Sequence, residues 1–488
     1  MCILRILSIL IVLFPVLVNG QSHQSLIEKE TLKKHIEVLA SDSLEGRGTG
    51  SRGLIKAQNY LIAEFERLGL MPGNQSSYLE NFTLEKRYMG ETYLSVGDKC
   101  WRNFDEVIFM PSGYFQQEEV EKEVVFGGYG SDEELDKIDL DDRFVVVFIA
   151  NLMAHTKIGM ELNKRGAYGM IAVKSSNDVQ QMSTMKSIFR DHYLKDHYGL
   201  RDIPNPRDTV SRGKSVVKSV RAVITPRSEL KKLMGYSAAK LQKIADRGEL
   251  TSIPNGKVKV KIEFLTDEME SANVTAFIPG TSEKKIVVTA HYDHLGMSEE
   301  GIFNGADDNA SGVAGMLQLA EALSGIKDLP YGIEFVAMSA EEPGLLGSKY
   351  HVNQPAFNPD EVLININLDM LGRQDEEHRN SDYLYVLGTD QSDSLKELIN
   401  QLDEVNDEVA IDYRHDQSSG FGGFYSRSDN YSFHQRGILA IFFHTGTHED
   451  YHHPTDTWQK IDYAALENRV KFIEEVLIQL QENAMLLN

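Results

Sequence analysis

From about residue 270 onward, short apolar runs with strand character alternate with longer segments of helical periodicity. We expect strands at 285–290, 333–338, 363–368, 383–387 and 438–443. Helices are expected at 311–324 and from about residue 462, because apolar side chains recur there at helical spacing. This alternation is typical of an α/β fold, with a mostly parallel, twisted sheet and helices on both of its faces.

Polar side chains that can bind metals follow these apolar runs. They are His291 and Asp293 in HYDH, Asp307 in NGADDN, Glu341 and Glu342 in SAEEPG, Asp369 in DMLGR, and His452 in HTGTHEDYHHPTDT. In open α/β sheets, functional groups collect outside the carboxyl ends of the strands, where turns are exposed and rigidly held. The sequence therefore predicts a metal-dependent enzyme.

Zinc suits this set of groups, because it accepts imidazole nitrogens and carboxylate oxygens. We expect His291 and His452 to supply nitrogens, and Asp307, Glu342 and Asp369 to supply oxygens. Three carboxylates and a bridging hydroxide can neutralise two divalent ions. We therefore predict two Zn²⁺ ions about 3.5 Å apart, with one carboxylate bridging them.

The adjacent Glu341 and Glu342 need separate roles, because neighbouring side chains in an extended segment point apart. One can bind a metal, while the other acts as a general base that takes a proton from metal-bound water and returns it to a leaving amine. Asp293, two residues after His291, is expected to orient the imidazole of His291.

Other histidines near the C-terminus leave the choice of ligand open. His444, His448 and His453 lie close to His452, and spacing alone does not select among them. Asp429 in SRSDNYSF has two interpretations, a further contact in the site or a structural role.

The rest of the chain divides into two parts. Residues 27–40 and 54–68 are predicted helices joined by the glycine-rich SDSLEGRGTGSRG, which we interpret as a tight connection beside the core and not as a nucleotide-binding loop. Residues 95–267 contain short strands and a helix, but no cluster of His and carboxylates. We expect an inserted mixed β/α domain at 95–267, between catalytic segments at 21–94 and 268–488.

The N-terminus and the net charge limit where this protein works and what it binds. Residues 1–20 have one Arg, an apolar stretch and small residues before Gln21, a pattern typical of a secretory signal peptide. We expect an exported protein without an integral membrane segment in the mature chain. The formal charge of −23 and the absence of basic clusters argue against nucleic-acid binding.

Five segments also resemble, in order, the motifs of the clan MH dizinc metallopeptidases. They are HYDHLG, NGADDNASGV, SAEEPGLLGS, INLDMLGR and YHHPTDT. That group includes secreted bacterial aminopeptidases and glutamate carboxypeptidase relatives, and LASDSLEGRGTGSRG is similar to the exported aminopeptidases. The resemblance implies a zinc-dependent exopeptidase that acts on peptides. FGGYG, VVVFI and KRGAYGMIAV within the insert resemble a protease-associated domain.

The resemblance also implies how the ligands divide between the metals. By this likeness, His291 and Asp369 bind one zinc ion, Glu342 and His452 bind the other, and Asp307 bridges them. The general base is then Glu341, and Asp293 orients His291. His452 is chosen over His453 because the family's final His stands four residues before an acidic residue, here Asp456. A cis peptide is implied at Asp307–Asp308.

Three alternative functions remain besides the aminopeptidase. A carboxypeptidase of the same family is not separated from it by the sequence. A glutaminyl cyclase-like enzyme would use one zinc ion, whereas GADDNAS favours two metals. A non-enzymatic receptor of the same fold should have lost ligands, and every expected ligand is present. Substrate side-chain preference and oligomeric state are left open.

Overall fold

A computed structural model describes residues 25–109, 117–174, 197–203, 220–224, 227–253, 255–378, 382–418 and 423–483. The predicted signal peptide at 1–20 lies outside these residues. Among the described residues, no helix is both long and apolar enough to cross a bilayer.

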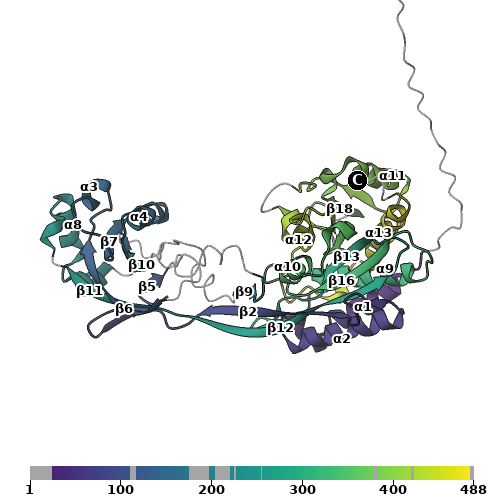
Figure 1. Ribbon diagram of the computed structural model, residues 1–488, viewed down its shortest axis with the longest axis horizontal. Helices are drawn as coiled ribbons and strands as arrows, with labels where there is room; N and C mark the ends of the chain where they lie inside the picture. Colours follow the sequence, from purple (N-terminus) through teal and green to yellow (C-terminus); the bar gives the residue numbers. More distant parts are fainter. Residues whose placement is uncertain are drawn as a thin grey trace, which may run out of the picture.

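The larger of two lobes is built on a ten-stranded sheet (Figure 1). Its strand order is β19 (Ala410–Asp412), β18 (Tyr383–Leu387), β20 (Ala440–His444), β17 (Val362–Leu368), β13 (Lys285–His291), β16 (Gly332–Met338), β12 (Phe264–Ile278), β2 (Leu79–Met89) and β9 (His197–Leu200), with β1 (Met71–Pro72) beside β12. The predicted α/β fold is confirmed, and the five strands predicted after residue 280 are all present.

The parallel part of the sheet is its centre. Strands β20, β17, β13 and β16 run parallel to one another. On either side of them, β12 pairs antiparallel with β16, and β18 pairs antiparallel with β20. The four parallel strands therefore end at one edge of the sheet, and this edge carries most of the side chains that we expected to bind metal.

Alternation along the central strands divides the core into two layers. Ile286 and Val288 of β13 face the larger layer, whereas Val287 faces the smaller one, and all three are fully buried. The larger layer is covered by α1 (Lys29–Leu39), α2 (Arg52–Arg67), α9 (Gly312–Ser324), α11 (Asp393–Val405) and α13 (Tyr463–Asn483). The smaller is covered by α10 (Leu346–Asn353) and α12 (Asn430–His434).

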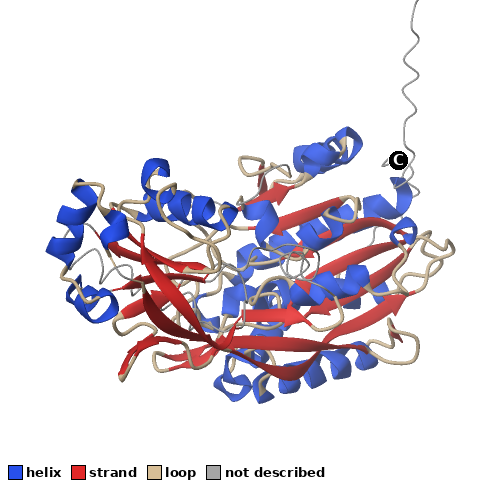
Figure 2. Ribbon diagram, turned by 60° about the vertical axis from the view of Figure 1, so that its left-hand side comes forward, coloured by secondary structure: helices blue, strands red, loops and turns tan. Residues whose placement is uncertain are grey.

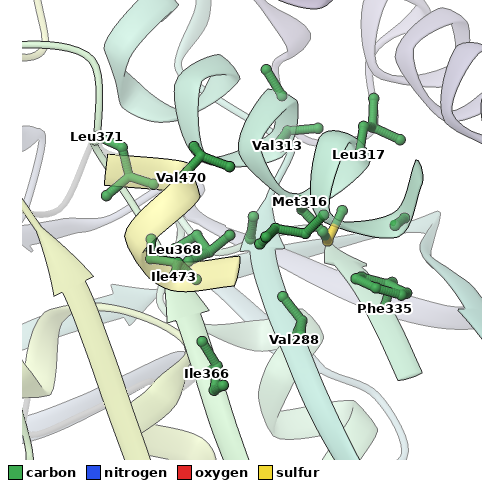
Figure 3. Packing of buried hydrophobic residues seen from close by; sticks show 14 of the residues in the cluster. Val288, Val313, Met316, Leu317, Phe335, Ile366, Leu368, Leu371, Val470 and Ile473 are labelled. Atoms are coloured by element: carbon green, nitrogen blue, oxygen red, sulfur yellow. The ribbon is translucent and has the colours of Figure 1, made fainter. Parts of the chain in front are cut away.

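Helices α9 and α13 pack directly on the parallel strands (Figure 3). Met316 of α9 and Ile473 of α13 contribute to the same layer as Val288 and Phe335 of the sheet. Close packing of this kind fixes the strand ends, and so holds rigidly the loops that follow them.

The smaller lobe contains an eight-stranded sheet. Its strand order is β4 (Lys99–Arg102), β3 (Tyr93–Val96), β11 (Gly256–Ile262), β6 (Gln117–Phe126), β7 (Phe144–Ile149), β8 (Gly169–Lys174), β10 (Val220–Ile224) and β5 (Val107–Phe109). One face packs on α7 (Leu230–Met234) and α8 (Ala238–Asp246), and the other on α3 (Asp132–Leu135) and α4 (Leu152–Lys164).

Strands β2 and β12 connect the two lobes as a long antiparallel ribbon (Figures 1 and 2). Their pairing extends from Val274 and Leu79 to Phe264 and Met89, where the chain enters and leaves the smaller sheet. The boundaries drawn from the sequence, 95 and 267, fall within β3 and β12. Strand character continues through both junctions, so the sequence pattern does not mark the change of sheet.

Candidate metal centre

The carboxyl ends of the parallel strands deliver a cluster of metal-binding side chains. His291 is the last residue of β13, Asp369 directly follows β17, and Glu341 follows the end of β16 by three residues. All three residues are buried. The predicted convergence of His291, Glu341, Glu342 and Asp369 at one edge of the sheet is what the structure shows.

Asp308 is at the centre of this cluster. Its Oδ1 lies 3.3 Å from Nε2 of His291, and that nitrogen is 3.3 Å from Oδ1 of Asp369. Its Oδ2 lies 3.2 Å from Nε2 of His452, which is 3.4 Å from Oε2 of Glu342. One carboxylate thus faces two separate groups of potential ligands.

Asp307 does not occupy this position, and our expectation that it bridges the two groups is wrong. Its Oδ1 accepts hydrogen bonds from the backbone N–H of Gly372 at 2.6 Å and from the hydroxyl of Ser311 at 3.0 Å. Its Oδ2 lies 3.2 Å from Nε2 of His448. These partners hold the Asp307 carboxylate away from His291. Two of them, Gly372 and His448, are distant in sequence, so the adjacent Asp307 and Asp308 alone did not reveal which carboxylate enters the site.

The turn around Asp308 is fixed by two buried polar side chains. Asp456 accepts hydrogen bonds from the backbone N–H groups of both Asp307 and Asp308. Oδ1 of Asn309 accepts from the N–H groups of Gly312 and Met370. The cis peptide bond lies between Asp308 and Asn309, so the implied position at Asp307–Asp308 is wrong by one residue.

Sequence reasoning missed His294, the second His of HYDH. It is almost fully buried, and its Nδ1 lies 2.7 Å from Oε1 of Glu342 and 3.8 Å from Oδ2 of Asp308. His294, Asp308 and Glu342 thereby form a second set of atoms close enough to hold one ion, beside the set of His291, Asp308 and Asp369. The position of His294, three residues after His291, was the sequence feature that could have identified it as a site residue.

The two adjacent glutamates have opposite electrostatic environments. Burial raises the pKa of Glu341 well above its usual range, and the neighbouring carboxylates of Glu342 and Asp429 raise it further. Burial also acts on Glu342, but hydrogen bonds from His294 and His452 lower its pKa overall. Glu342 is thus held as an anion between two imidazoles, whereas Glu341 is the stronger base of the two.

Asp293 supports the site mainly through backbone contacts. Nδ1 of His291 lies 3.2 Å from the backbone carbonyl oxygen of Asp293, and 4.0 Å from its carboxylate. That carboxylate accepts hydrogen bonds from the Glu341 N–H at 3.1 Å and from the Thr49 hydroxyl at 2.9 Å. Asp293 therefore holds the segment that bears Glu341 beside His291.

The structure separates the histidines near the C-terminus. His453 is exposed, and His448 contacts Asp307. Nδ1 of His444 lies 2.8 Å from the backbone carbonyl oxygen of Asp369. His452 faces Asp308 and Glu342, and these carboxylates raise its pKa to about 10 against the opposing effect of burial.

The glycine-rich turn after α1 packs against the back of the site. Arg47 is buried there and donates hydrogen bonds to the backbone carbonyls of Leu39, Tyr292, Asn304 and Gly305. Its neighbour Gly46 has a φ of +65°, and an added Cβ would lie 2.3 Å from the carbonyl oxygen of Gly296. Glycine is required at this close approach.

Comparison with known proteins matches residues 273–477 to peptidase family M28. The matched region contains every residue of the two ligand sets. Residues 273–477 are thus an M28-like region. The resemblance to clan MH metallopeptidases is therefore confirmed.

Curated relatives of this M28 domain include a probable leucine aminopeptidase of Arthroderma otae. It is 30% identical over 231 residues, which are 45% of this chain and 60% of the relative. Aminopeptidase YwaD of Bacillus subtilis is 33% identical over 191 residues, 37% of this chain and 38% of the relative. The chain spans less than two thirds of the length of either relative.

Solved structures of similar fold include BSAP, a zinc aminopeptidase from Bacillus subtilis. It is 18% identical, with a TM-score of 0.49 and coverage of 93% of this chain and 96% of that one. An aminopeptidase from Aneurinibacillus sp. strain AM-1 is 20% identical, with a TM-score of 0.48 and coverage of 93% and 94%.

The ligand sets of the M28 domain fit zinc in their chemistry. Both combine imidazole nitrogen with carboxylate oxygen, and the ligand atoms within each set lie within 4.8 Å of one another. The two sets share Asp308. Beside them, a pocket opens between the ligands and the segments at 424–428 and 442–452.

Proposed function

We propose that this protein is an exported, zinc-dependent aminopeptidase that removes N-terminal residues from peptides. The observation that carries the proposal is the pair of ligand sets joined by Asp308, with the carboxyl group of Glu341 beside them in the same pocket. Peptidases of this kind need both a metal site and a nearby group that transfers protons.

His291, Asp308 and Asp369 would hold one zinc ion, and Asp308, Glu342 and His452 the other. His452 is preferred for the second ion because its Nε2 faces both carboxylates at the mouth of the pocket. His294 would then orient Glu342 through the oxygen that His452 does not contact. When bound, zinc would supply Lewis acidity, polarising the scissile carbonyl and favouring deprotonation of the attacking water.

Glu341 is the proposed proton carrier. It lines the pocket, and its N–H is fixed by Asp293, so the side chain projects from a rigid segment. Its raised pKa suits a group that accepts a proton from the attacking water and delivers it to the leaving amine.

Recognition of a free amino end is inferred from the charge of the pocket floor. Asp308, Glu341, Glu342 and Asp369 line it together. Such a concentration of carboxylates favours a cationic amine over an anionic carboxyl end.

Blocking each end of a substrate tests this proposal. A series of peptides would carry a free or acetylated amino end, combined with a free or amidated carboxyl end. We expect acetylation to abolish cleavage and amidation to leave a substrate that is still cleaved. Loss of cleavage on amidation alone would instead identify a carboxypeptidase, an alternative favoured by one observation, the cation Arg427 among the pocket residues.

The proposal also includes export, directed by the signal peptide at 1–20. It further includes a role of the insert in substrate choice. The insert's likeness to a protease-associated domain, in FGGYG and KRGAYGMIAV, supports such a role. N-terminal sequencing of the secreted protein tests the first point, because a start at or near Gln21 would show cleavage of the leader.

A further inference from the structure

A guanidinium group stands at the rim of the acidic pocket. Among the described residues that line the pocket, Arg427 is the only arginine or lysine. Its side chain is exposed, whereas Ser428 and Asp429, which follow it, are fully buried. The backbone that carries Arg427 is thus fixed to the core while its charged end remains accessible.

Arg427 is positioned by contacts that leave most of its donors free. Its guanidinium lies 5.4 Å from the ring centre of Phe424, and Nη2 donates a hydrogen bond to the Tyr451 hydroxyl at 3.3 Å. Both partners are pocket residues. An arginine has five N–H donors, so the observed hydrogen bond uses one of them.

No carboxylate partner of Arg427 is found within the described part of the chain. Two other arginines of the same domain differ in this respect: Arg373 pairs with Asp450 at 3.1 Å, and Arg469 pairs with Asp382 at 3.2 Å. The planar guanidinium matches the geometry of a carboxylate and can bind it through two parallel hydrogen bonds. Arg427 offers that arrangement to a molecule in the pocket.

We propose that Arg427 binds a carboxylate of the substrate. The inference rests on the proposed peptidase function and narrows it to substrates that carry an anionic group near the scissile bond. With its amine near the carboxylates of the floor, such a substrate would place its carboxylate at the rim. The group is either the α-carboxylate of a short peptide or the side chain of an acidic N-terminal residue.

Matched substrate pairs test the assignment in the full-length zinc enzyme. The dipeptide Leu-Gly is compared with Leu-Gly amide, and the 4-nitroanilide of Glu with that of Gln. In Arg427→Gln we expect kcat/KM to fall by roughly 10- to 100-fold for members with the recognised carboxylate, as for loss of a hydrogen bond between charged groups. Loss confined to Leu-Gly identifies the α-carboxylate, and loss confined to Glu anilide identifies the side chain.

Two further variants separate recognition from structure. Arg427→Lys keeps the charge without the planar fork and should recover part of the loss. Arg436→Gln removes an equal charge near the opposite end of β20, where Arg436 is exposed, and should change neither member of a pair. An equal loss for all substrates in Arg427→Gln, or no loss for any, would overturn the proposal.

A binding measurement keeps this test independent of peptidase activity. Leu-Gly with a reduced peptide bond is not hydrolysed, so calorimetric titration compares its acid and amide forms on wild type and Arg427→Gln. We expect the wild type to prefer the acid and the variant to bind both equally. If wild type cleaved no peptide and still showed this preference, the proposed function would fail while the role of Arg427 stood. Equal binding of both forms by wild type would refute that role.

Discussion

At the residue scale, two adjacent aspartates in one turn take different directions. Asp308 faces His291 and His452, whereas Asp307 accepts hydrogen bonds from Gly372 and Ser311. Spacing along the strands predicted that a carboxylate from this turn would enter the site. It did not predict which one, because the choice depends on partners more than 60 residues away in sequence, such as Gly372.

Substitution of each aspartate should therefore have a distinct effect. Asp308→Ala removes the carboxylate shared by both ligand sets and should lower zinc content and hydrolytic rate together. Asp307→Ala should leave zinc bound but lower the free energy of unfolding by about 1–3 kcal/mol, since it leaves buried donors unpaired. Elemental analysis and chemical denaturation of both variants distinguish these outcomes, and zinc loss restricted to Asp307→Ala would restore the sequence-based assignment.

The adjacent glutamates provide a second pair. Glu341→Gln keeps the shape of the side chain but removes proton transfer, so we expect kcat to fall by roughly 10²- to 10⁴-fold with zinc content unchanged. Glu342→Gln should instead reduce zinc affinity, because it removes an anion held between His294 and His452. Zinc content and kcat are measured for both variants. If Glu341→Gln lost zinc and Glu342→Gln kept it, the roles of the two glutamates would be exchanged.

The sequence predicted only some of the histidines in the site. His291 and His452 were identified from the sequence, and both lie at the shared carboxylate. His294 was not, because a His at the end of HYDH has no distinguishing periodicity. Its burial and its contact with Glu342 mark it as part of the site.

At the element scale, a buried ion pair fixes α10, the helix after the two glutamates. Glu80 of β2 lies 3.1 Å from Nδ1 of His351 in α10 and accepts a hydrogen bond from Asn273 of β12. Glu80→Ala should lower the free energy of unfolding by about 3–5 kcal/mol, because it leaves a buried imidazole without its anion. Glu85→Ala, at a partly exposed pair with Arg87 on the same strand, is the control and should cost no more than about 1 kcal/mol.

The pair should also make stability depend on pH. The pKa of Glu80 is lowered because hydrogen bonds and the His351 charge outweigh its burial, and that of His351 is raised by Glu80. The contribution of Glu80 is present above its unfolded pKa and is lost on acidification. That of His351 is present below its unfolded pKa of about 6.5 and is lost as pH rises through its folded value. The difference in the free energy of unfolding between wild type and Glu80→Ala should therefore be largest between these two pKa ranges and should narrow toward both extremes of pH, whereas a constant difference would contradict the account.

The strands illustrate what periodicity does and does not reveal. Apolar runs predicted the central parallel strands within one or two residues, because buried parallel strands are continuously apolar. The β2–β12 ribbon was not predicted as part of the catalytic sheet. The outer half of β12 is largely exposed and charged, so it lacks the apolar pattern of a buried strand. Its pairing partner lies nearly 200 residues away in sequence.

At the scale of the whole molecule, the geometry of the ribbon allows the smaller lobe to be removed together with β9, the edge strand that pairs with β2. The Gly90 N–H donates a hydrogen bond to the Glu263 carbonyl at 2.8 Å, so the ends are already adjacent. Replacing residues 91–262 with Asn-Gly would close the ribbon as a two-residue hairpin. We expect zinc content to be retained and relative rates across a peptide series to change. Unchanged relative rates would show that the insert has no part in substrate choice.

The central claim is a site in which two zinc ions share Asp308 and both serve hydrolysis. It is tested most directly by adding zinc stepwise to the chelated protein while measuring bound metal, hydrolysis of a Leu anilide and thermal stability on the same samples. We predict binding of two ions per chain, full activity only as the second ion binds, and a rising melting temperature, since binding to the folded state stabilises it. Full activity with one ion per chain would contradict the account and favour a single-zinc enzyme.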